Sequence, residues 1–215
     1  MVDVTASRPG VDDAGGGKLF APAAGRNAAA VAEALVRLLG DLPGGEVLEI
    51  GAGTGQHAVA CAAALPRLTW RPTDPDPAHL ASIAAWATEA ALPNLRAPLQ
   101  LNVVGEWPAA APAAPIALYA ANVVHIAPWT VAEAIFAGAG ARLAPGGRLM
   151  LYGPFFDQGE ATEGNRAFDR SLRGRDPAWG LRDIRDLDAL AARCRLGPAQ
   201  RTAMPANNLI LSFRR

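Results

Sequence analysis

A cluster of glycines after a short apolar run is the part of this sequence best suited to chemistry. Residues 46–50 read Glu-Val-Leu-Glu-Ile, and Gly51, Gly53 and Gly55 follow them. Glycine lets the backbone turn sharply and lets a ligand approach it closely. In a doubly wound fold, a turn that follows a strand and opens a helix faces the crevice where ligands bind. The segment therefore predicts either a ligand-binding loop or a tight turn without a ligand.

Two common nucleotide-binding loops do not match this segment. A dinucleotide loop reads G-x-G-x-x-G, but here the third glycine comes one position early, and Gln56 stands where the last glycine would be. A phosphate loop of the Walker type would continue with Gly-Lys and then Ser or Thr, which do not follow here. Asp74 follows the next predicted strand, and a carboxylate at that place can accept hydrogen bonds from both hydroxyls of a ribose.

The glycine segment resembles the S-adenosylmethionine (SAM) loop of class I methyltransferases, which reads E-x-G-x-G-x-G and has an acidic residue at the end of the next strand. The resemblance implies that the loop approaches the methionine part of SAM and that Asp74 holds its ribose. Arg26 and Asn27, at the start of a predicted helix, either reach the cofactor carboxylate or, through Asn27, cap that helix. The predicted cofactor-binding residues are Arg26, Glu49, Gly51, Gly53, Thr54, Gly55, His57, Asp74, Asn102 and Val103.

Polar residues after the later strands predict a substrate side to this site. His125 follows the apolar run 116–121 and can act as a general base on a hydroxyl or amine, or simply bond to the backbone. His79 lies in a predicted helix and is expected at the surface. The scattered histidines and the two cysteines, Cys61 and Cys194, lack the spacing of metal ligands, so no metal is predicted. The predicted catalytic residues are Asn122, His125, Tyr152 and Asn207.

The elements that must position these residues alternate between strands and helices. Strands are expected at residues 46–50, 68–73, 99–103, 116–121 and 148–152. Helices are expected at residues 27–39, 56–65, 78–91, 131–143 and 186–194. This alternation predicts an α/β fold with a parallel sheet. Two last apolar runs, 199–203 and 209–213, are spaced to form an antiparallel hairpin at the edge of that sheet.

Composition limits the partners and the organisation. Lys and Arg number 20 and so do Asp and Glu, so the net charge of zero argues against a nucleic-acid partner. No apolar stretch is suited to a membrane. No charged segment followed by an apolar one begins at Met1, so we expect no secretory signal and a cytoplasmic location. Residues 1–17 are expected to be a mobile N-terminus and 18–215 a single domain. Within it, the mixed-charge segment 157–185 is either a solvated face or a lid-like insertion.

A wider resemblance covers most of the chain. Its segments include Gly-Gln-His-Ala at 55–58, Trp-Arg-Pro-Thr-Asp-Pro-Asp at 70–76, Asn-Val-Val-His-Ile-Ala-Pro-Trp at 122–129 and Met-Pro-Ala-Asn-Asn-Leu at 204–209. From about Leu19 onward the chain resembles the methyltransferase-like protein 26 family, whose members have the class I SAM-dependent methyltransferase fold. The resemblance implies a Rossmann-like, doubly wound, seven-stranded sheet with an antiparallel last strand, and SAM as cofactor. It implies no particular substrate.

Two departures from that family fall where a cofactor or substrate would lie. The family usually reads Glu-Arg-Asn-Lys where this chain has Gly25-Arg26-Asn27-Ala28, and it usually has Asp where this chain has Asn102. An amide still accepts a hydrogen bond from an adenine amino group, but it carries no charge.

Three hypotheses follow. The first is a SAM-dependent methyltransferase acting on a small molecule, with secondary metabolism as one setting. The second is a methyltransferase-fold protein that performs a cyclisation or elimination in a biosynthetic pathway. The third is a non-catalytic binding or regulatory protein. A protein partner or a homodimer stays open under each hypothesis.

Overall fold

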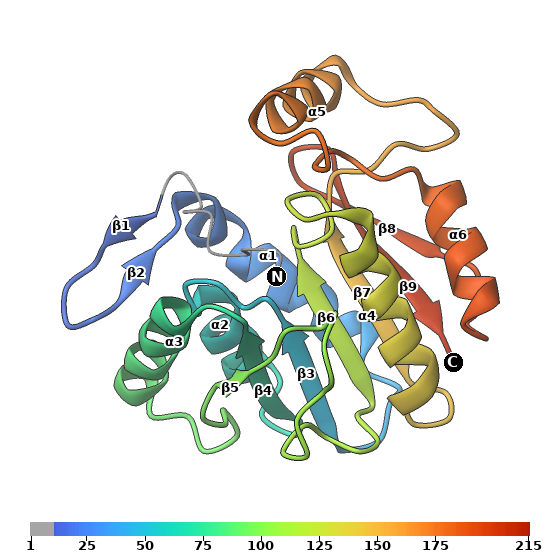
Figure 1. Ribbon diagram of the computed structural model, residues 1–215. Coiled ribbons are helices and arrows are strands. Elements are labelled where there is room, and N and C mark those ends of the chain that lie inside the picture. The colour runs from blue at the N-terminus through green and yellow to red at the C-terminus, as the bar shows by residue number, and fades with distance from the viewer. Residues whose placement is uncertain (1–10) are drawn as a thin grey trace. The chain divides into compact units, whose positions relative to one another are not determined.

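The computed structural model describes residues 11–215 and separates the chain into two compact units, one ending at Pro112 and one beginning at Ala113 (Figure 1). Residues 1–10 of the predicted mobile N-terminus lie outside the described part of the chain. Each unit has its own strands, helices and buried core.

The first unit opens with a small hairpin rather than at the predicted boundary after residue 17. Strand β1 (Asp12–Asp13) pairs antiparallel with β2 (Leu19–Phe20). The backbone N–H of Leu19 donates to Ser82 Oγ at 2.8 Å, and the indole Nε1–H of Trp86 donates to the Leu19 carbonyl at 2.9 Å. These two contacts attach the hairpin to helix α3 (Pro77–Ala90).

Three parallel strands form the sheet of the first unit, in the order β5-β4-β3. They are β3 (Glu46–Ile50), β4 (Thr69–Asp74) and β5 (Leu99–Gln100). Strand β3 is buried on both faces, as expected of a parallel strand covered by helices. Strand β5 is shorter than the predicted 99–103 because Asn102 starts a turn. Its side-chain oxygen accepts from the N–H of Val104, and its carbonyl accepts from the N–H of Gly105.

The helices of this unit are α1 (Pro22–Leu38), α2 (Gln56–Ala64) and α3. Helix α1 begins earlier than the predicted 27–39, because Pro22 occupies its first turn, where a missing N–H costs nothing. Asn27 therefore lies inside the helix and does not cap it. Asp76 caps α3 by accepting from the N–H of Ala78 at 2.8 Å. The fully buried core side chains of the unit include Val31, Leu35, Val47, Leu48 and Trp70.

Four strands form the sheet of the second unit, in the order β6-β7-β9-β8. They are β6 (Ala117–Ala121), β7 (Arg148–Gly153), β8 (Gln200–Met204) and β9 (Asn208–Arg214). Strands β6 and β7 are parallel, whereas β9 runs antiparallel to both β7 and β8. The predicted antiparallel hairpin is confirmed. Its turn holds Ala206 and Asn207 at positive φ, a conformation that asparagine tolerates well.

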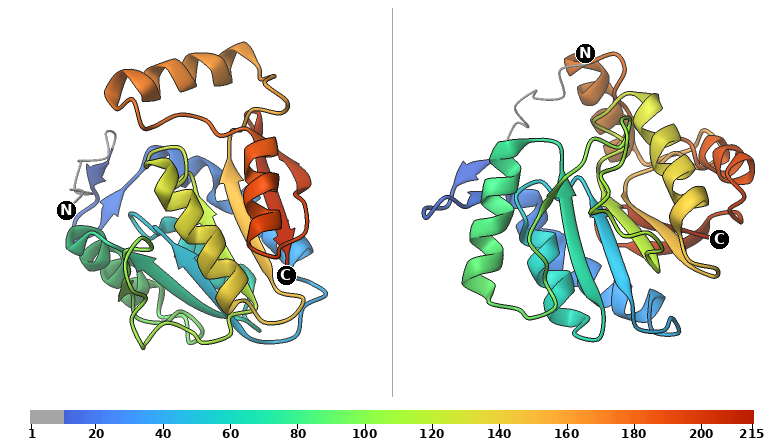
Figure 2. Two further views of the ribbon diagram at one scale, coloured as in Figure 1. Left: turned by 45° about the vertical axis from the view of Figure 1, so that its right-hand side comes forward. Right: turned by 60° about the horizontal axis from the view of Figure 1, so that its bottom comes forward.

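Helices α4 (Trp129–Arg142), α5 (Glu163–Arg175) and α6 (Ile184–Arg193) complete the second unit. Helices α4 and α6 pack against each other, and Phe136 of α4 meets the ring of Phe213 edge to face at 4.9 Å. Helix α5 is joined to the unit by a loop at each end (Figure 2, left). It was predicted as a polar segment without a helix. A cap from Thr162 and the Arg173–Asp169 ion pair one turn apart favour the helix locally, and Leu172 is its one buried residue.

Helices separate β3 from β4, β4 from β5 and β6 from β7, whereas a loop without a helix joins β5 to β6, and the last strand, β9, is antiparallel. The predicted α/β class is therefore confirmed. None of the helices in residues 11–215 is long and apolar enough to cross a bilayer.

Candidate functional site

The glycine loop of the first unit has the backbone conformation that its sequence predicts. Gly51, Gly53 and Gly55 have φ angles of 64°, 58° and 96°, which L-residues with a side chain rarely adopt. A Cβ at Gly55 would also lie 2.9 Å from the Cα of Ile83 in α3. The loop leads directly into α2, whose first N–H groups have no partner within the helix. A ligand can thus approach this backbone closely.

Asp74 holds the loop in place. Its Oδ2 accepts from the N–H of Gly53 at 2.9 Å, and its Oδ1 accepts from the N–H of Asp76 at 3.0 Å and contacts Nδ1 of His79 at 3.1 Å. The carboxylate is 1% exposed. Asp74 therefore ties together the glycine loop, the turn after β4 and α3, and its contact with a ribose stays a prediction. The expectation that His79 lies at the surface is wrong, because its ring packs onto this buried carboxylate.

Glu49 lies beneath the loop, shielded from solvent. Its carboxyl accepts from Nε1 of Trp70 at 2.7 Å, and its backbone carbonyl accepts from the hydroxyl of Thr73. Burial raises the pKa of Glu49 to about 7, an effect that the Trp70 hydrogen bond opposes and the charge of Asp74 adds to. Glu49 is 1% exposed and is paired with an indole, so it supports the loop from below, and its contact with a cofactor stays a prediction.

Thr54 and His57 also form hydrogen-bonding contacts with other side chains of the first unit. The hydroxyl of Thr54 donates to Oε1 of Gln56 at 2.8 Å, and that oxygen also accepts from the N–H of Ala21 at 2.7 Å. The ring Nε2 of His57 lies 2.7 Å from Oδ1 of Asn27. Burial lowers the pKa of His57 to about 4, so its ring is neutral at pH 7. These contacts fasten α1 to the start of α2. Sequence reasoning missed Gln56, although it opens α2 in the segment Gly-Gln-His-Ala.

Arg26 and Asn102 are the predicted cofactor residues that face solvent, whereas Val103 is buried. Arg26 has no hydrogen bond or ion pair to any residue in the described part of the chain. The neighbouring Gly25 has a steric reason to be glycine, because a Cβ there would lie 2.8 Å from Cζ of Phe20. Glycine at this position therefore lets the Phe20 ring lie against α1.

In the second unit, Asn122 and His125 converge at the end of β7. Asn122 has a φ of 57°, and a Cβ at Gly153 would lie 2.9 Å from its Oδ1 and 2.3 Å from Nε2 of His125. His125 is fully buried, and neither ring nitrogen has a hydrogen-bond partner among residues 11–215. Burial first, and the charge of Arg182 second, lower its pKa to about 3. A buried polar side chain without a hydrogen-bond partner is a candidate functional residue, and His125 is one.

The other two predicted catalytic residues lie differently. Tyr152 is buried on β7, and its backbone carbonyl accepts from the N–H of Asn122 at 2.8 Å. Asn207 is exposed in the β8–β9 turn, and its carbonyl accepts from Nδ2 of Asn165 in α5 at 3.1 Å. The structure thus brings Asn122 and His125 together at Gly153, while Asn207 contacts the helix within the predicted lid-like segment.

Arg182 is a site residue that the sequence did not reveal. Its Nε donates to the carbonyl of Val124 at 2.9 Å, and its Nη2 donates to the carbonyl of Ala127 at 2.6 Å. It therefore holds the loop that carries His125. Its separation of 58 residues from Val124 leaves no local signal of this contact in the sequence.

Comparisons with known proteins agree with this architecture. Similar solved structures include the SAM-dependent methyltransferase SibL, which is 22% identical with a TM-score of 0.68. An O-methyltransferase family protein from Burkholderia thailandensis is 13% identical with a TM-score of 0.70. Human N-acetylserotonin methyltransferase, solved with SAM, is 14% identical with a TM-score of 0.69. The matches cover 85%, 86% and 90% of this chain but 56%, 56% and 52% of those chains.

The fold is therefore that of the class I methyltransferases, as the sequence predicts. Residues 18–215 also match the model of a family described as a protein of unknown function, DUF938, and the chain belongs to that family.

Proposed function

We propose that this protein is a SAM-dependent methyltransferase that acts on a small molecule in a biosynthetic pathway. The observation that carries the proposal is the loop of three left-handed glycines, which Asp74 holds at the end of β3. The names of the similar structures support it, since SibL and the human enzyme are both methyltransferases. The proposed kinship with methyltransferase-like protein 26 agrees with the same activity.

The residues of the first unit suit SAM in shape and charge. The glycine loop accepts close approach of the methionine part, and the exposed guanidinium of Arg26 would pair with the SAM carboxylate. The exposed amide of Asn102 would accept from the adenine amino group. When bound, SAM supplies a methyl group on a positively charged sulfur.

Asn122 and His125 are the polar groups of the second unit that suit hydrogen bonding with a small-molecule substrate. Methyl transfer to carbon-bound oxygen or nitrogen is an in-line displacement, so the protein mainly holds the nucleophile in line and excludes water. The low pKa keeps His125 neutral at pH 7, and a neutral imidazole accepts a hydrogen bond from a hydroxyl or amine. Asn122 adds an amide beside it.

Calorimetric titration of the full chain with SAM and with S-adenosylhomocysteine tests the proposal. Micromolar binding that Gly55→Ala weakens would support it, because a Cβ at this position meets both positive φ and the backbone of Ile83. Gly174→Ala is the matched control, since nothing lies within 4 Å of a Cβ there. Folded wild-type protein that fails to bind millimolar SAM would overturn the proposal and favour non-methylation chemistry or a non-catalytic role.

A further inference from the structure

A groove of about 470 Å³ lies in the second unit, and the proposed function gives none of its lining residues a direct contact with SAM or the methyl acceptor. Its lining comes from three helices and the connection between two of them. Trp129 opens α4, Arg173 lies on α5, Arg182 belongs to the connection before α6, and Asp186 and Arg193 lie on α6. Guanidinium groups of arginine bind carboxylates and phosphates through paired, charge-assisted hydrogen bonds, so their presence in this groove favours a small anionic ligand.

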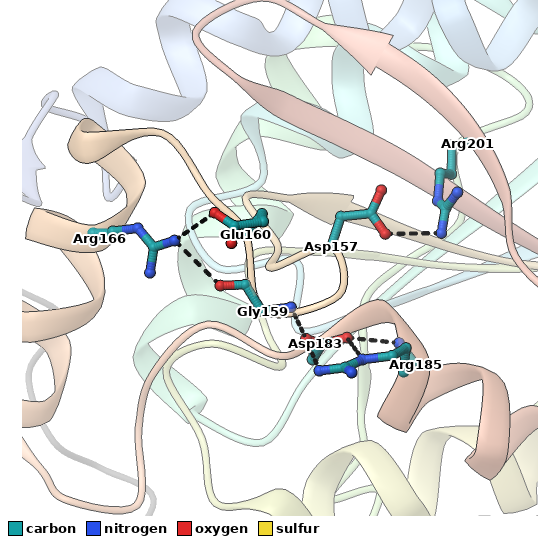
Figure 3. A network of polar contacts seen from close by, with 7 residues as sticks. All are labelled: Asp157, Gly159, Glu160, Arg166, Asp183, Arg185 and Arg201. Atoms are coloured by element: carbon teal, nitrogen blue, oxygen red, sulfur yellow. Dashed lines mark hydrogen bonds and ion pairs between the residues drawn. The ribbon is translucent and has the colours of Figure 1, made fainter.

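Most charges at the groove have internal partners. Arg173 donates through Nε to the carboxylate of Asp169 at 2.9 Å. Asp183 accepts from the N–H of Gly159 at 2.7 Å and forms an ion pair with Arg185 at 3.1 Å (Figure 3). Figure 3 shows that this carboxylate points into the polar framework of the loop before α5. Asp183 therefore has a cationic partner of its own, whereas the exposed Asp186 leaves one carboxylate in the lining of the groove.

Arg182 differs from Arg173 and Asp183 because every group that accepts a hydrogen bond from it is a neutral backbone carbonyl. Its guanidinium donates to the carbonyls of Val124, Ala127 and Ala178, and no carboxylate within residues 11–215 forms an ion pair with it. A guanidinium has five N–H donors, and these three bonds involve Nε and Nη2. The two donors on Nη1 have no partner in the part of the chain described. Arg182 is also partly buried, so water screens its charge less than at an exposed site.

A second arginine reinforces this positive charge. Arg173 and Arg182 line the same groove, and the charge of Arg173 adds to burial in lowering the pKa of Arg182. Asp169 offsets only part of that repulsion. The terminal Nη donors of Arg173 are not used by its pair with Asp169, which goes through Nε. Two like charges near each other, each with unused donors, are stabilised by an anion between them.

We propose that this groove binds the carboxylate or phosphate group of a small molecule between Arg173 and Arg182. Because Arg182 also holds the carbonyls of Val124 and Ala127, a bound anion would restrain the loop that carries His125. The site is separate from the glycine loop and does not depend on SAM binding.

Titration of the full chain, followed by ¹H–¹⁵N NMR, tests the site without SAM. Inorganic phosphate and acetate are added separately, with sodium chloride holding the ionic strength constant. The expected result is saturable shifts at the Trp129 indole and the Arg182 Nε, with at least one of the two anions. The anion with the higher affinity assigns the ligand as a phosphate or a carboxylate, and saturation by neither anion overturns the proposal.

Variants localise the binding. Arg173→Gln is expected to weaken the affinity about tenfold by removing a charge-assisted contact, and Arg182→Gln at least as much. Arg170→Gln is the matched control, because Arg170 lies on the same helix, pairs with Glu163 and does not line the groove. If Arg182→Gln fails to fold, the anion affinity of Arg173→Gln alone tests the site, and an affinity equal to that of the wild type would overturn the proposal. An equal loss in Arg170→Gln would show non-specific attraction and overturn the proposal.

Discussion

The carboxylate of Asp74 accepts a hydrogen bond from the backbone N–H of Gly53 at 2.9 Å. The last residue of β4 therefore holds the glycine loop that follows the neighbouring strand β3. This contact explains why a glycine-rich loop, with its high conformational freedom, keeps one shape. It also makes Asp74 a structural member of the candidate site, whatever its contact with a ligand.

Asp74→Asn should destabilise the protein by about 1–3 kcal/mol, because an amide nitrogen would then face donors that now meet a carboxylate. Its affinity for SAM should fall as well, since Gly53 loses its anchor. Urea unfolding measures the first effect. Asp76→Asn is the control, because asparagine keeps an oxygen that caps α3. Equal unfolding midpoints for the two variants would contradict the anchoring role.

Glu49 should make stability fall as the pH rises from about 4.5 to about 7. Its folded pKa of about 7 lies above its ordinary value of 4.5, so the native state binds more protons than the unfolded state in this window. The contribution is complete below pH 4.5 and is lost as the pH passes through 7, with a size on the order of 3 kcal/mol.

Unfolding in urea at pH 5 and pH 8 measures the effect of Glu49. The difference in the free energy of unfolding between pH 5 and pH 8 should shrink in Glu49→Gln, which cannot ionise. It should stay as in the wild type in Glu46→Gln. Glu46 lies on the same strand but pairs with Arg71 in a partly exposed place. A pH dependence that survives in Glu49→Gln would assign it to another group.

His125 should remain neutral down to about pH 4, because burial and the nearby Arg182 both disfavour its charged form. Its folded pKa of about 3 lies below 6.5, so its contribution to stability is complete above pH 6.5 and is lost as the pH falls toward 3. Ring nitrogen shifts in a ¹H–¹⁵N NMR titration report the protonation directly. A midpoint near 6.5 would show that the ring is open to water.

Gly153→Ala should destabilise the second unit by about 1–3 kcal/mol and displace His125. The new Cβ would lie 2.3 Å from Nε2 of His125, and the φ of 152° is unfavourable for alanine. Thermal unfolding and the His125 ring signals measure the two effects. Gly174→Ala, in open space on α5, should not lower the unfolding temperature, because alanine favours a helix, and should leave the His125 signals unchanged. A Gly153→Ala protein as stable as the wild type would contradict the prediction, because it would mean that the His125 ring can move away from an added Cβ at no cost.

Local patterns in the sequence were enough to predict the α/β class, the terminal hairpin and the glycine loop. Each depends on residues close together in the chain, such as the apolar run before Gly51 or the two runs that became β8 and β9. Helix α5 was missed because Leu172 is its one buried residue, so it has no apolar stripe facing a core, and a local cap and ion pairs stabilise it instead.

Tertiary structure decided what the individual site residues do. Asp74 meets Gly53 across 21 residues and Arg182 meets Val124 across 58, and no local pattern specifies either contact. Burial likewise made Glu49 a support for the loop, His79 a partner of Asp74 and His125 a neutral ring, because the environment of a side chain depends on which distant elements pack around it. The sequence by itself determined where a ligand can approach the backbone, and the packing determined which side chains are left to meet it.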